Sequence, residues 1–97
     1  MDISIKAIHF DITEKLTAFI NKKVERIVRR FPAVGAVDIS LKVVKPETAL
    51  NKQVIIKVAV PQAEDFVADK TADSFEEAID LALEAVEKQL EKNKNKK

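Results

Sequence analysis

Residues 73–94 read DSFEEAIDLALEAVEKQLEKNK and carry both a helix start and an apolar face at helical spacing. Ser74 with Glu77 makes a capping box, in which each side chain satisfies a free backbone N–H of the other residue, and Asp73 with Glu76 is an equally good register. The apolar face consists of Phe75, Ile79, Ala82, Leu83, Val86 and Leu90, and the opposite side of Glu76, Glu77, Asp80, Glu84, Glu87 and Glu91. The segment therefore predicts an amphipathic helix whose apolar side needs a second layer to cover it.

The chain before this helix alternates apolar and polar residues in four places, which is typical of half-buried strands. The predicted strands are residues 2–8, the two arms of a hairpin at 37–44 and 54–60, and a shorter strand at 65–71. The hairpin connection, residues 45–52, is longer than a tight turn, and we expect it to be mobile.

A further amphipathic helix is predicted over residues 13–30. Its apolar stripe consists of Leu16, Ile20, Val24, Ile27 and Phe31. An oxygen side chain at Asp11 or Thr13 can cap its first turn, and Pro32 with Gly35 ends it. The order β-α-β-β-β-α with one apolar face per element predicts an α+β fold, a four-stranded sheet with both helices on one face. The first strand should reach a parallel neighbour by a right-handed crossover.

Composition limits the possible functions. The 97 residues, 46% hydrophobic and 34% charged, predict one domain over residues 1–92 and a flexible basic tail at 93–97. With no Cys and one His, disulfides, thiolate zinc sites and imidazole clusters are excluded. Because there is neither a membrane span nor a secretory signal, we expect a cytoplasmic protein. We also expect a monomer when free, with no metal, cofactor or small-molecule substrate.

The net charge of +1 hides a strong separation of charge along the chain. Residues 15–30 hold six cations and one acid, residues 64–91 ten acids and two lysines, and residues 92–97 four lysines. At roughly 100° per residue, the six cations of the first helix fall within an arc of roughly 120°. They are Lys15, Lys22, Lys23, Arg26, Arg29 and Arg30. Two interpretations remain open: a surface for nucleic-acid phosphates, or a solvated face that the acids of the second helix neutralise.

Lysines gather again where the second helix ends, at Lys88, Lys92, Lys94, Lys96 and Lys97. Four lysines in the last six residues exceed what the negative end of a helix needs. If both helices run in the same direction, their basic ends lie at one end of the domain, and we expect the acidic half of the second helix to face solvent elsewhere.

Several classes of site and fold are disfavoured. His9 has no partners at a useful spacing and is interpreted as a turn residue. Gly35 is the only glycine, which argues against the GxxG loop of a KH domain, and five Phe without Tyr or Trp argue against the base-stacking sheet of an RRM. Among the modes of RNA binding considered, the one that remains is contact of helix surfaces with the phosphates of a structured RNA, which recognises its shape.

The closing helix resembles that of the ribosome hibernation promoting factor family. The matching positions are Asp73, Phe75, Ala78, Ile79, Asp80, Lys88, Gln89, Leu90, Lys92 and Lys94, and Ile3-Ser4-Ile5 and Ile12-Thr13-Glu14 are similar to the family's opening strand and first helix. The chain departs from the family pattern at Ala7, Ile8 and His9, and Phe75 keeps the aromatic ring but lacks the hydroxyl of the family's common tyrosine.

This resemblance implies a short-form, non-enzymatic translation inhibitor that occupies the transfer RNA and messenger RNA sites of the small ribosomal subunit. It implies contacts to ribosomal RNA phosphates by Lys22, Lys23, Arg26, Arg29, Arg30, Lys88, Lys92 and Lys94. The alternative is a protein-interaction module that holds a basic partner with its acidic segment 64–91.

Overall fold

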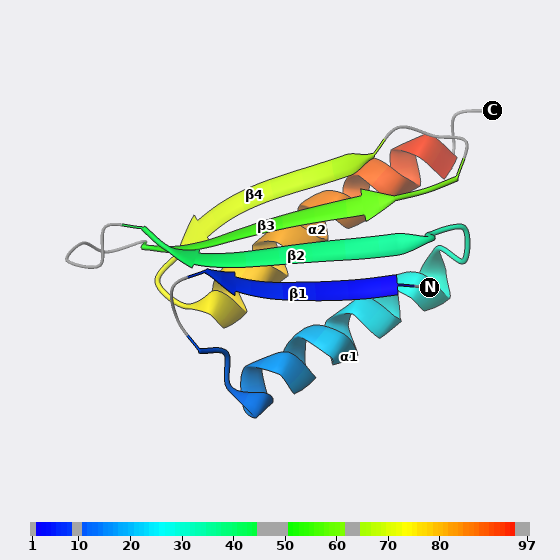
Figure 1. The fold of residues 1–97 in the computed structure, drawn as a ribbon. Coiled ribbons are helices and arrows are strands. Elements are labelled where there is room, and N and C mark those ends of the chain that lie inside the picture. Colours follow the sequence, from blue (N-terminus) through cyan, green and yellow to red (C-terminus); the bar gives the residue numbers. More distant parts are fainter. Residues whose placement is uncertain (1, 9–10, 45–50, 62–64, 95–97) are drawn as a thin grey trace.

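The computed structural model describes residues 2–8, 11–44, 51–61 and 65–94. Its elements are β1 (Asp2–Ile8), α1 (Glu14–Arg30), β2 (Ala36–Val43), β3 (Lys52–Ala59), β4 (Phe66–Ala72) and α2 (Phe75–Lys94). The strands form one sheet in the order β1-β2-β3-β4, and both helices lie on the same face of it (Figure 1). The predicted α+β architecture is therefore confirmed.

The sheet follows directly from the alternation in its strands. On β2 and β3 every second side chain faces the helices, and Ile39 and Ile56, directly opposite each other, are at most 1% exposed. β1 runs parallel to β2 and places Ile5 beside Ile39. The other face of the sheet carries exposed side chains such as Asp38 and Lys42. The buried apolar residues form one cluster between the sheet and the two helices.

Helix α1 makes the connection between the two parallel strands, as predicted. Thr13 is its N-cap, and the hydroxyl oxygen of this residue accepts a hydrogen bond from the backbone N–H of Leu16 at 3.1 Å. Ile20, Val24 and Ile27 on one side of the helix are buried in the core. The stripe seen in the sequence is thus the face that attaches α1 to the sheet.

Helix α2 covers β3 and β4. The hydroxyl of Ser74 accepts a hydrogen bond from the backbone N–H of Glu77 at 3.2 Å, so the first of the two capping registers is used. Ala78, Ile79 and Val86 are fully buried. The Gln89 amide donates to the carbonyl oxygen of Val67 at 3.1 Å and so connects α2 to edge strand β4. This helix is fixed to the sheet by packing and by a side-chain hydrogen bond.

The element ends differ slightly from the sequence interpretation. β3 begins at Lys52, because the Val44 N–H donates to the Asn51 carbonyl at 2.8 Å and extends the base of the hairpin. α2 continues to Lys94, two residues into the tail expected at 93–97. His9, most of the connection 45–52, residues 62–64 between the last two strands and residues 95–97 lie outside the described residues.

The strand directions orient both helices in the same way. β1, β2 and β4 point in one direction and β3 in the other. Each helix returns along the sheet after a strand of the first kind, so α1 and α2 run side by side and end at the same end of the molecule (Figure 1). The condition under which the basic ends of both helices lie at one end of the domain is therefore met.

Candidate nucleic-acid interface

The solvent side of α1 carries the cations that the sequence singled out. We call Lys15, Lys22, Arg26 and Arg29 the outer row; all four are exposed. None of the four forms an ion pair with another residue in the described ranges. The outer row runs from Lys15 to Arg29, about four helical turns, so it spans roughly 20 Å of the helix axis. The outer row can therefore offer several unpaired donors to one extended anion.

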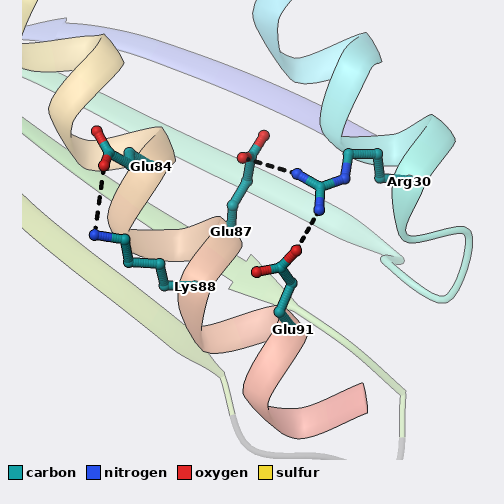
Figure 2. A network of polar contacts seen from close by, with 5 residues as sticks. All are labelled: Arg30, Glu84, Glu87, Lys88 and Glu91. Carbon is teal, nitrogen blue, oxygen red and sulfur yellow. Dashed lines mark hydrogen bonds and ion pairs between the residues drawn. The ribbon is translucent and has the colours of Figure 1, made fainter. Parts of the chain in front are cut away.

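The other two cations of α1, Lys23 and Arg30, face α2 and are paired. We call them the inner pair. The Lys23 ammonium lies 3.3 Å from the Asp80 carboxylate. One terminal nitrogen of Arg30 lies 3.1 Å from a Glu87 oxygen, and the other contacts Glu91 (Figure 2). Both ends of the guanidinium fork are thus occupied by carboxylates.

These ion pairs have a regular register. Lys23 and Asp80 are 57 positions apart, as are Arg30 and Glu87, and the two pairs are separated by seven residues on each helix. Seven residues are about two helical turns, so the same relation between parallel helices repeats. Each exposed ion pair contributes about 0–1 kcal/mol. Their main effect is to place a row of acids, Asp80, Glu87 and Glu91, beside the cations of α1; we call it the acidic row.

The position of the acidic row corrects one expectation. The sequence predicts that the acidic half of the second helix faces solvent elsewhere, but Asp80 of that half is paired with α1, as are Glu87 and Glu91 nearer the C-terminus. The second interpretation of the six cations of α1, that acids of α2 neutralise them, therefore applies to the inner pair. The outer row has no such partner among the described residues.

The second basic cluster lies on another side of α2. Lys88 and Lys92 are exposed, and the Lys88 ammonium lies 3.4 Å from the carboxylate of Glu84 one turn before it. In Figure 2, Glu84 and Lys88 project from one side of α2, whereas Glu87 and Glu91 project toward Arg30. The backbone of Lys94 is helical. Carboxylates thus stand between Lys88 and Arg30, and the two clusters do not merge there.

Aromatic rings support the cations of α1. The Lys23 nitrogen lies 5.4 Å from the centre of the Phe19 ring, and the Arg30 guanidinium carbon lies 5.2 Å from that of Phe31. Such contacts favour a cation over a ring face by about 0.5–1 kcal/mol at exposed sites. The inner pair is therefore held both by carboxylates and by rings.

The described ranges, residues 2–8, 11–44, 51–61 and 65–94, also bear on metal binding and on cavities. No three His, Cys, Asp or Glu side chains among those residues could hold a metal ion together. A cavity of about 200 Å³ is lined mainly by apolar residues, including Phe31, Val34 and Leu90, with Arg30 at its edge. None of the helices in this part of the chain is long and apolar enough to cross a membrane.

The acidic row is the part of the site that sequence reasoning misplaced. A signal was present: Lys23 and Arg30 are seven residues apart, as are Asp80 and Glu87. In two parallel helices with equal spacing, opposite charges can meet twice. Using this signal required knowing which sides of the two helices face each other.

Two named relatives align with almost the whole chain. A ribosome hibernation promoting factor from Azotobacter vinelandii is 28% identical over 96 residues, which cover 99% of this chain and 85% of the relative. A ribosome hibernation promoting factor from Pseudomonas putida is 27% identical over 96 residues, covering 99% and 89%.

Solved structures share the fold over a similar length. A ribosomal subunit interface protein from Coxiella burnetii superimposes with a TM-score of 0.87 at 27% identity, covering 99% of this chain and all of that one. The N-terminal domain of Protein Y from Thermus thermophilus gives 0.80 at 19% identity, covering 96% and 99%, a likeness of fold alone. The family model described as "Sigma 54 modulation protein / S30EA ribosomal protein" matches residues 3–97, and the chain therefore belongs to this family.

Proposed function

We propose that this protein is a hibernation factor that binds the small ribosomal subunit and occupies its transfer RNA and messenger RNA channel. Relatives of this chain are named ribosome hibernation promoting factors, which supports a role in ribosome hibernation. The observation that carries the proposal is the outer row, four exposed cations on one side of α1 that have no ion-pair partner among the described residues. Ribosomal RNA phosphates are the partner that such a row fits.

The proposed contact is electrostatic and depends on shape. Arginine planes can donate two parallel hydrogen bonds to phosphate oxygens, and lysines act as mobile point charges. A rigid helix laid against an RNA backbone reads its geometry and not its bases. The sheet behind α1 keeps the row straight, because the buried face of the helix is fixed in the core. Lys88, Lys92 and Lys94 are proposed as a second, separate contact to RNA.

Inhibition on this proposal is exclusion. A folded domain of this kind that fills the channel keeps transfer RNA and messenger RNA out without any bond being made or broken. The protein needs no cofactor for this and works in the cytoplasm, where ribosomes are found. It acts as long as it stays bound.

The experiment is co-sedimentation of the full chain with small ribosomal subunits at low and raised salt, with and without initiator transfer RNA. We expect pelleting that weakens steeply as salt increases, because phosphate contacts release counterions. Transfer RNA should displace the protein. No pelleting at low salt would overturn the proposal and favour an interaction module that holds a basic protein with residues 64–91.

A further inference from the structure

The carboxylates of α2 stand where a phosphate would have to approach the inner pair. Both terminal nitrogens of Arg30 are engaged, one by Glu87 and the other by Glu91 (Figure 2). These nitrogens are the ones that a bidentate phosphate contact needs. The Glu87 side chain is only 21% exposed, so it is largely buried beside Arg30. Arg30 itself is 43% exposed, so these acids act by occupying its donors and by their charge beside it, and not by covering it.

The outer row has different surroundings: its nearest acid on α1 is Glu25, which forms no ion pair with it among the described residues. Its side chains project from α1 on the side away from the core, and their nearest neighbours along the helix surface include one another. Arg26 and Arg29 are three residues apart and Lys22 and Arg26 four, so each lies next to the other on the same surface. Lys22, Arg26 and Arg29 thus form a line of positive charge on the helix surface, which suits an extended anion better than a compact one.

We infer that the acidic row sets the edge of the RNA-binding surface, keeping the inner pair from phosphates and confining one phosphate backbone to the outer row. This inference rests on the proposed function and specifies its partner surface. Asp80, Glu87 and Glu91 are then specificity residues, because their negative charge disfavours a strand that approaches the inner pair. An RNA backbone lying along the outer row is accepted.

Removal of these acids should strengthen binding to RNA, although it breaks ion pairs within the protein. In the double variant Glu87→Gln and Glu91→Gln, Arg30 becomes available to phosphate. The salt dependence of binding to small ribosomal subunits, as log K against log salt, should become steeper by about one. Gln has nearly the helix propensity of Glu, so α2 should stay intact, and thermal unfolding by circular dichroism checks this.

A matched control separates local charge from net charge. The double variant Asp38→Asn and Asp69→Asn changes the charge by the same amount, on the sheet face that points away from the helices. Its salt slope should equal that of the unmodified protein. Asp80→Asn, which frees Lys23, is a second and smaller test of the same effect. Equal slopes in the Glu87/Glu91 variant and the control, or weaker binding in the Glu87/Glu91 variant, would overturn the inference.

A second probe distinguishes this inference from the proposed function. Heparin is a sulfated polyanion, so a heparin column measures binding through charge in the absence of ribosomes. If the unmodified protein fails to pellet with small subunits, the proposed function is overturned, and elution from heparin still decides the role of the acidic row. Later elution of the Glu87/Glu91 variant than of the Asp38/Asp69 variant supports the shielding of Arg30, and equal elution contradicts it.

Discussion

Helices α1 and α2 share one face of one sheet and run in one direction, yet they differ in what their polar sides do. The polar side of α1 is divided between the exposed outer row and the paired inner pair. Acids on the polar side of α2 are turned toward α1. This difference shows that the neighbours of a cation in the sequence do not determine whether its charge is paired or available to a ligand. Lys22 and Lys23 are adjacent in sequence, and only Lys23 has a carboxylate partner among the described residues.

The largest effect is expected where the packing that holds α2 in place is removed. Ile79 is 0% exposed, whereas Leu81 on the same helix is 41% exposed. Ile79→Ala should lower the free energy of unfolding by about 2–5 kcal/mol, because it removes buried methyl groups and leaves a cavity. Leu81→Ala should lower it by less than about 1 kcal/mol. Urea denaturation measures both, and similar losses would mean that α2 is not packed as described.

A smaller effect is expected at the two helix starts. The Ser74 and Thr13 hydroxyls each accept one backbone hydrogen bond, at 3.2 and 3.1 Å. Ser74→Ala and Thr13→Ala should each lower the free energy of unfolding by about 1 kcal/mol. Ser4→Ala, at an exposed position on β1, serves as the control and should change little. Loss at one cap alone would show that the two helices contribute unequally to folding.

The smallest effect concerns the ion pairs between the helices. A double-mutant cycle with Arg30→Gln and Glu87→Gln should give a coupling energy of about 0.2–1 kcal/mol. Chemical denaturation in urea measures it, and added salt should reduce it because both side chains are partly exposed. The i,i+4 pair Glu84 and Lys88 provides a comparison within one helix, at about 0.3–0.5 kcal/mol. No coupling between Arg30 and Glu87 at low salt would remove the electrostatic link between α1 and α2.

Much of the fold was predictable because its signals are local. The Ser74 cap, the stripe from Ile20 to Ile27 and the alternation around Ile39 each report the environment of neighbouring residues along one element. The division of the cations was not predictable in this way. Whether Arg30 is free depends on which side of α2 faces α1, and that orientation is set by the packing of both helices on the sheet. The extension of β3 to Lys52 depends likewise on a bond between Val44 and Asn51, residues at opposite ends of the connection.

The central claim, that the outer row carries the binding to ribosomal RNA, is tested most directly by two variants of equal charge. Arg26→Gln with Arg29→Gln removes two cations of the outer row, and Lys6→Gln with Lys42→Gln removes two exposed cations from the other face of the sheet. Co-sedimentation with small ribosomal subunits over a series of salt concentrations should show the log–log salt slope fall by about two for the first variant. The second should match the unmodified protein. Equal loss in both variants, or an unchanged slope in the first, would contradict the account.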